Sequence, residues 1–141
     1  KSINDGHGHS VGDHVLLAFA DHCRQTLRTN DLIGRWGGEE FVVWLRDIDL
    51  AAAARVLSRL RAELPAICQQ RGLPEATVSI GCTAVSPIDE IDVEALVARA
   101  DAALYRAKDA GRNQIHVGGD HAGRLTDSGT FTVAELAGRS A

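Results

Sequence analysis

The sequence has no apolar run long enough to cross a membrane, no secretory signal at its start and no excess of positive charge. It has 15 Lys and Arg and 19 Asp and Glu, and the resulting net charge of −4 argues against broad binding to nucleic acid. Its three cysteines, Cys23, Cys68 and Cys82, are an odd number without C-x-x-C spacing, which is typical of reduced thiols. We therefore expect a cytoplasmic protein that contacts neither membrane nor nucleic acid.

The residues that are present fit one globular domain. A chain of 141 residues, 45% hydrophobic and 24% charged, has the size and composition of such a domain. Hydrophobic spacing and β-branched runs predict helices at 12–27, 50–66 and 93–110 and strands at 32–36, 41–45, 77–85 and 114–117. This order predicts an α/β (α+β) sandwich, in which helices flank a central, mostly antiparallel sheet.

The end of the chain looks different from the rest. Beyond Gly118, glycines and small polar residues predict a loose tail over 118–141. A further strand at 130–133 is an open alternative. We therefore expect the folded domain to span 1–117.

A Gly-Gly-Glu-Glu-Phe block at 37–41 lies between two β-like runs. Two glycines at such a place predict a two-residue hairpin turn, because glycine adopts positive φ without strain. The turn would present Glu39 and Glu40 side by side, and adjacent carboxylates suit a hard cation such as Mg²⁺ that also binds phosphate oxygens. The alternative is a solvated hairpin tip without a ligand.

Further blocks surround this turn in a fixed order. They read K-x-I-N-D-x-x-G-H-x-x-G-D over 1–13, S-I-G over 79–81, A-D-A-A-L-Y-R-A-K over 100–108 and G-R-N over 111–113. Together with the Gly-Gly-Glu-Glu-Phe turn, these blocks resemble the GGDEF family of diguanylate cyclases over residues 1–117. The resemblance implies a nucleotide-cyclase, palm-like fold and the synthesis of cyclic di-GMP from two GTP molecules.

The chain departs from the family pattern at its start. In the family a strand precedes the position of Lys1, runs through the sheet centre and carries a metal-binding aspartate. That strand is missing here, because the sequence opens on Lys1 inside the first block. We therefore expect an N-terminally truncated domain that is weakly active or inactive.

The resemblance assigns the catalytic residues. It implies that Glu39 binds the metal, Mg²⁺ or Mn²⁺, and acts as the base, with Glu40 as a supporting metal or phosphate ligand. It places Lys1 near the reacting phosphate and Lys108 and Arg112 on the triphosphate. The alternatives are a solvated Glu40 and cations that favour the dipole of a helix end.

The resemblance also assigns the recognition of the base. Asn4 and Asp13 match the guanine-contacting residues of the family, and His9 matches the histidine between them. From spacing alone, Asp13 is equally suited to cap a helix N-terminus. A transition-metal cluster is a further alternative, with candidate ligands Asp5, His7, His9, Asp13 and His14.

Regulation is implied by an R-x-x-D motif, formed by Arg28 and Asp31 upstream of the turn. In the family this motif at this offset is the product-inhibition site, and Arg59 resembles its secondary arginine. The alternative is a simple ion pair at a helix end. Because each subunit would hold one GTP, turnover implies a homodimer. The rival functions are a non-catalytic receptor for cyclic di-GMP or GTP and a structural interaction module.

Overall fold

The computed structural model describes residues 2–85, 92–118 and 129–138. Its five strands form one sheet in the order β1-β2-β5-β3-β4, and only the β3–β4 pair is parallel. The predicted α+β fold with a mostly antiparallel sheet is therefore confirmed. The elements are α1 (Ser2–His7), α2 (His9–Thr26), β1 (Leu32–Gly37), β2 (Glu40–Arg46), α3 (Leu50–Gln70), β3 (Ala76–Val85), α4 (Val93–Asp109), β4 (Ile115–Gly118) and β5 (Gly129–Gly138).

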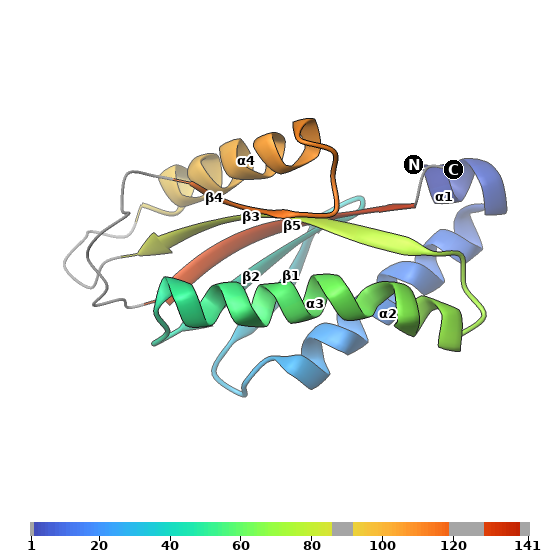
Figure 1. Ribbon diagram of the computed structural model, residues 1–141, viewed down its shortest axis with the longest axis horizontal. Coiled ribbons are helices and arrows are strands. Elements are labelled where there is room, and N and C mark those ends of the chain that lie inside the picture. Colours follow the sequence, from blue (N-terminus) through green and yellow to red (C-terminus); the bar gives the residue numbers. More distant parts are fainter. Residues whose placement is uncertain (1, 86–91, 119–128, 139–141) are drawn as a thin grey trace.

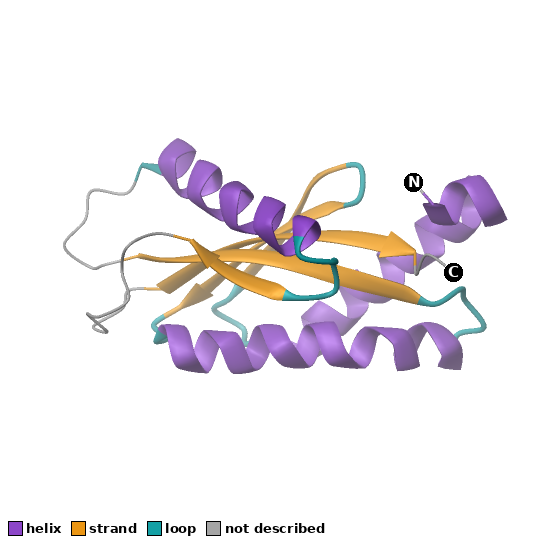
Figure 2. Ribbon diagram, turned by 45° about the horizontal axis from the view of Figure 1, so that its top comes forward, coloured by secondary structure: helices purple, strands orange, loops and turns teal. Residues whose placement is uncertain are grey.

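The helices divide between the two faces of the sheet (Figures 1 and 2). On one face α2 and α3 enclose the larger core, in which Phe19 of α2 meets Phe41 of β2 edge to face. On the other face α4 covers a smaller core that includes Leu96 and Leu104. Because successive strand residues point to opposite faces, every functional residue on a strand belongs to one of these two layers.

The helix boundaries follow their caps. Asp49 accepts a hydrogen bond from Ala52 N at 2.6 Å and starts α3, and Asp92 accepts one from Ala95 N at 3.2 Å and starts α4. The predicted end of the second helix at residue 66 is wrong. Helix α3 continues through Pro65 to Gln70, since Leu64 and Cys68 extend its buried stripe.

The first 26 residues hold two helices rather than one. Helix α1 lies before α2, and Gly8, with φ of 85°, separates them. Because α2 begins at His9 and its N-cap is Gly8, Asp13 lies inside the helix. The alternative that Asp13 caps a helix is therefore wrong.

The largest surprise is the C-terminal strand. The prediction of a loose tail over 118–141 is wrong for 129–138, which form β5 at the centre of the sheet, antiparallel to β2 and β3 (Figure 1). The physical reason is that β2 and β3 each offer a row of backbone donors and acceptors to a strand placed between them. The open alternative of a strand at 130–133 is confirmed and extended.

No helix in the described ranges is both long and apolar enough to span a membrane. The three cysteines are free and buried, and burial raises the pKa of Cys23 to about 12 and that of Cys82 to about 11. Burial also raises the pKa of Cys68. All three thiols are therefore protonated and unreactive at neutral pH.

Candidate active site

The hairpin turn lies one residue later than the sequence predicts. Gly37 is the last residue of β1 and pairs with Glu40, so Gly38 and Glu39 form the two-residue connection. Gly38 has a φ of 46°, which favours glycine. The register shifts between Arg35 and Gly37, and this irregularity moves the turn.

Arg35 holds the turn in place. Its Nε and Nη2 atoms donate to the Gly38 carbonyl oxygen at 2.9 and 2.7 Å. On the other side of the hairpin, Leu136 N of β5 donates to the Glu39 carbonyl oxygen at 3.1 Å. The turn that carries the two acids is therefore tied to β1 and to the central strand.

The two acids belong to different layers. Glu39 lines a cleft on the α2 side of the sheet. Glu40 shares its strand face with Val42 and Trp44, which pack against α4, whereas Phe41 between them enters the α2–α3 core. The pair therefore cannot act as one chelating unit on one face.

The cleft beside Glu39 has a volume of about 210 Å³ and gathers residues from α1, α2, the turn and β5. Three predicted nucleotide ligands, Asn4, His9 and Asp13, lie in its wall with Glu39. These residues come from distant parts of the sequence. The structure thus brings together the predicted base-binding residues and one predicted catalytic acid.

Asn4 is held at the closest approach of α1 and α2. A Cβ atom on Gly12 would overlap Asn4 Oδ1, so only glycine leaves room for this side chain. Asn4 Oδ1 is buried and has no hydrogen-bond partner among the described residues. A buried acceptor without a partner costs free energy, which a ligand that donates to it can recover.

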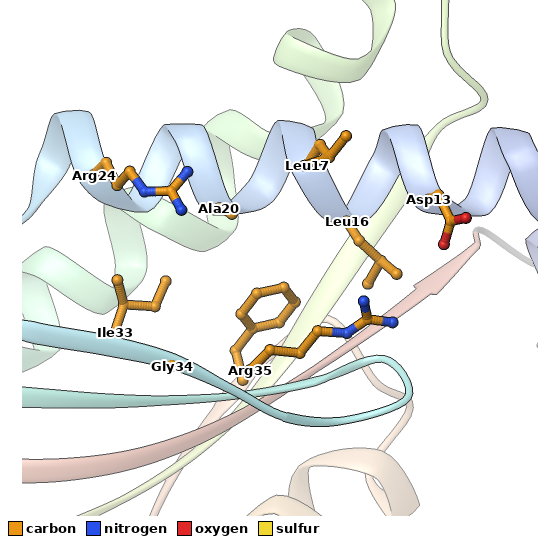
Figure 3. Close-up of a pocket in the computed structure, with 9 residues that line it drawn as sticks. Asp13, Leu16, Leu17, Ala20, Arg24, Ile33, Gly34 and Arg35 are labelled. Atoms are coloured by element: carbon orange, nitrogen blue, oxygen red, sulfur yellow. The ribbon is translucent and has the colours of Figure 1, made fainter.

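A second pocket of about 450 Å³ continues from the cleft between α2 and β1 (Figure 3). Asp13, Leu16 and Arg35 line both spaces. In Figure 3, Arg35 extends from β1 toward the end of α2 that carries Asp13. Sequence reasoning missed Arg35, although its place two residues before the Gly-Gly pair was a usable signal.

The predicted phosphate ligands lie on the α4 side. Lys108 Nζ lies 2.7 Å from Glu135 Oε2 of β5. Arg112 is exposed and has a φ of 61°, in a loop where Asn113 also has positive φ. Such backbone strain in a non-glycine residue is frequent at functional sites.

That loop is anchored from three directions. Asn113 N donates to Ser79 Oγ at 3.1 Å, and Arg61 Nη1 of α3 donates to the Asn113 carbonyl oxygen, also at 3.1 Å. Gln114 Nε2 donates to the carbonyl oxygens of Ala110 and Arg112. The Arg112 backbone is therefore fixed, while its side chain is exposed.

Two further expectations concern Lys1 and a transition-metal cluster. Lys1 lies outside the described residues. Across the described ranges no three His, Cys, Asp or Glu side chains are grouped so as to hold a metal ion, so the cluster proposed around His7 and His9 does not form there. A metal at Glu39 would therefore need ligands from the nucleotide.

The R-x-x-D motif forms a compact loop. Asp31 Oδ2 accepts from Arg28 N at 2.9 Å and Asp31 Oδ1 accepts from Arg46 N at 3.1 Å. The two side chains form no ion pair among the described residues, so the surface-pair alternative is not what the structure shows. Arg59 lies on α3, where its Nε donates to Glu63 at 3.0 Å.

Sequence and structure comparisons define the class. The family described as "Diguanylate cyclase, GGDEF domain" matches residues 1–114, and the chain belongs to this family. Diguanylate cyclase DgcP of Pseudomonas aeruginosa is 46% identical over 119 residues, which are 83% of this chain but 17% of that protein. The chain thus spans well under two thirds of that relative.

Solved structures agree with this assignment. Diguanylate cyclase SiaD of Pseudomonas aeruginosa, in complex with its activator SiaC, has a TM-score of 0.75 at 37% identity, covering 83% of this chain and 45% of that one. The GGDEF domain of DgcB from Caulobacter crescentus, in complex with c-di-GMP, has a TM-score of 0.72 at 27% identity, covering 82% and 70%.

Proposed function

We propose that this domain condenses two GTP molecules into cyclic di-GMP and releases pyrophosphate. The observation that carries the proposal is the cleft in which Asn4, Asp13 and Glu39 meet. The family and the activity named for its relatives support the same reaction. The residues of the site then have three proposed roles, which are base recognition, phosphate binding and proton transfer.

Guanine recognition is the role of the cleft. The Asp13 carboxylate can accept hydrogen bonds from guanine N1–H and the 2-amino group, and the buried Asn4 Oδ1 supplies another acceptor. Adenine has no donor at either position, so ATP would leave these acceptors unpaired. A site built in this way rejects the nucleotide that lacks the matching donors.

A divalent cation, Mg²⁺ or Mn²⁺, fits beside Glu39. Mg²⁺ commonly takes one or two carboxylates together with substrate phosphate oxygens, which matches a single acid at the rim of a nucleotide cleft. When bound, the cation would neutralise phosphate charge and acidify the attacking hydroxyl. We assign Glu40, which faces the α4 layer, a supporting role as ligand of a phosphate-bound cation, since a carboxylate without a cation repels phosphate.

The reaction needs positioning more than covalent chemistry. The 3′-oxygen of one GTP bonds to the α-phosphorus of the other, the bond from that phosphorus to the β-phosphate oxygen breaks, and pyrophosphate leaves. The reciprocal attack by the 3′-oxygen of the second nucleotide closes the ring and releases a second pyrophosphate. Glu39 accepts the hydroxyl proton, while Lys108 and Arg112 bind the triphosphate. Because each domain holds one GTP, two copies must face one another in a two-fold homodimer.

Product inhibition is assigned to Arg28 and Asp31, with Arg59 as the secondary arginine. The Arg28 side chain is exposed, and arginine can bind guanine O6 and N7 with two hydrogen bonds. The Asp31 carboxylate holds the loop through two backbone donors and has acceptor capacity left for the opposite edge of guanine.

A non-catalytic GTP or cyclic di-GMP receptor is the second candidate. The observation in its favour is that Glu39 and Glu40 lie in different layers and form no metal-binding group of three within the described ranges. Under this function GTP would bind in the same cleft without turnover.

Replacement of Glu39 by Gln separates the two candidates. We expect Glu39→Gln to lower the rate of cyclic di-GMP formation by at least about 100-fold, in line with the loss of a proton-transfer group, and to leave GTP binding within a few-fold. The matched control is Glu94→Gln, an exposed acid in the first turn of α4. Chromatography of the products with GTP and Mg²⁺ measures the rate. Because this chain lacks the family's first strand, the rates are compared in a chain extended upstream of Lys1 to restore the metal-binding aspartate. An extended chain that binds GTP but makes no product would favour the receptor.

A further inference from the structure

The central strand β5 places one acid, Glu135, beside the predicted phosphate ligand Lys108. Glu135 lies outside the residues that match the family. The match ends at residue 114, whereas Glu135 lies on β5, between β2 and β3. Glu135 is in register with Glu40 on one side and with Ser79 on the other. Residues directly opposite in neighbouring strands point to the same face, so Glu135 and Glu40 share the α4 layer.

Glu135 engages the lysine assigned to the triphosphate. Its Oε2 lies 2.7 Å from Lys108 Nζ, and the two side chains are 16% and 32% exposed. The exposed pair of Arg59 and Glu63 is longer, at 3.0 Å, and its side chains are 61% and 45% exposed. Because solvent screens the Lys108–Glu135 pair less, this contact is stronger than an ordinary surface ion pair.

The charges around the Lys108–Glu135 contact oppose the transfer of Lys108 to a phosphate group. Glu40 and Glu135 are like charges directly opposite one another, which destabilises a pair of strands unless a cation lies nearby. Lys108 supplies that cation. A phosphate group that draws Lys108 away must break the ion pair, leave two carboxylates without their counter-charge and approach them with its own negative charge.

We propose that Glu135 competes with the triphosphate for Lys108 and thereby lowers the affinity of the site for phosphate groups. The inference rests on the proposed function in taking Lys108 as a phosphate ligand. In this arrangement the C-terminal strand both completes the sheet and places an acid where a phosphate would otherwise bind. Nucleotide affinity then depends on how firmly β5 holds Glu135 against α4.

Calorimetric titration of the whole chain with inorganic tripolyphosphate, in the presence of a metal chelator, tests the competition. This probe has no guanine, so its binding does not depend on Asn4 or Asp13. Glu135→Gln should bind it about tenfold more tightly than the wild type, the change expected from freeing one charged contact. Glu94→Gln, which removes an exposed acid from the first turn of α4, is the control and should bind as the wild type does.

The gain in tripolyphosphate affinity must depend on Lys108. The Lys108→Gln/Glu135→Gln double variant should lose it and bind no more tightly than the wild type. Glu135→Asp, which keeps the charge but shortens the side chain, should show a smaller gain in the same direction, and it replaces Glu135→Gln if that variant fails to fold by circular dichroism. Unchanged or weaker tripolyphosphate binding in the folded Glu135 variant would overturn the competition.

The outcome also separates this inference from the proposed function. If Glu135→Gln has no effect while Lys108→Gln weakens GTP binding, the competition is wrong and the phosphate role of Lys108 stands. If Lys108→Gln changes neither GTP nor tripolyphosphate binding, the assignment of Lys108 fails, and the competition fails with it.

Discussion

The two layers of this domain give the two acids of the hairpin, Glu39 and Glu40, opposite surroundings. On the α2 side, Glu39 borders an open cleft with Asp13 and with a buried Asn4 oxygen that has no partner in the described part of the chain. On the α4 side, Glu40 faces Glu135, whose charge is already balanced by Lys108. The cleft layer thus offers an unsatisfied Asn4 oxygen to a ligand, whereas the α4 layer must exchange an existing contact for a new one.

This difference suggests a division of labour. Groups without partners give specificity, because only a ligand with matching donors recovers their cost. A paired cation gives control, because its partner sets how readily it binds phosphate.

The largest effect should come from replacing each of the two acids, Glu39 and Glu40, by glutamine in separate variants. Glu39→Gln should remove cyclic di-GMP formation, whereas Glu40→Gln should lower its rate by about 10-fold, a reduction that corresponds to one modest electrostatic contribution. Initial rates of product formation at saturating GTP and Mg²⁺ measure both variants. Equal losses would mean that the two carboxylates act together and that their separation into layers has no functional meaning.

The next effect concerns the contact between α1 and α2. Gly12→Ala would push a methyl group into Asn4 Oδ1 and displace that amide from the cleft wall, so it should weaken GTP binding, while the higher helix propensity of alanine offsets part of the cost to the fold. Gly6→Ala is the matched control, because nothing lies within 4 Å of a Cβ there and alanine favours the helix more than glycine does. Urea denaturation and GTP titration report the two effects. A Gly12→Ala variant with wild-type stability and affinity would show that Asn4 is not held as described.

A pair of variants in the R-x-x-D loop should separate ligand binding from stability. Asp31→Ala removes the acceptor of two backbone N–H groups and should cost about 1–2 kcal/mol of unfolding free energy. Arg28→Ala should leave stability unchanged but lose most of the affinity for cyclic di-GMP, because a bidentate arginine–guanine contact contributes about 1–3 kcal/mol. Thermal melts and calorimetric titration distinguish them. Wild-type product affinity in Arg28→Ala would rule out this site.

The smallest effect should be a pH dependence of the α2–α3 layer. Burial lowers the pKa of His22, and Glu63, 3.8 Å away, opposes the shift only in part. Since the unfolded chain binds this proton more readily, stability should be full above pH about 6.5, the ordinary histidine pKa, and should fall as the pH drops through the lowered pKa of the folded state.

The control for this slope is an exposed histidine on α1. His22→Gln should flatten the fall in stability between neutral and mildly acidic pH, and His7→Gln should leave it unchanged. Urea denaturation across that range measures the slopes. Parallel curves for the wild type and His22→Gln would mean that His22 does not govern the acid sensitivity.

Much of the site could be predicted from the sequence, because its blocks are local. The hairpin, with its two strands, lies where short patterns place it, and Asn4 and Asp13, which the family resemblance predicts to bind the base, lie in one cleft. The turn itself was displaced by one residue, because the register shift after Arg35 depends on pairing between strands. Such a shift leaves no mark in a single strand.

The central strand could not be predicted with the same ease. The sequence of β5 begins and ends in glycine and follows a stretch of small polar residues, and it becomes a strand because β2 and β3 leave a place between them. Long-range pairing of this kind depends on the whole sheet and not on local propensity. The contact of Glu135 with Lys108 was invisible for the same reason.

Above all, we propose that the cleft formed by α1, α2 and the turn recognises guanine. Displacement of a labelled GTP analogue by unlabelled GTP and ATP, in the wild type and in Asp13→Ala, tests it most directly. We expect GTP to displace the label at least about 100-fold more effectively than ATP, as for a site whose acceptors lose their matching donors. Asp13→Ala should lose most of this preference while its helix content is retained. Equal displacement by GTP and ATP in the wild type would contradict the account.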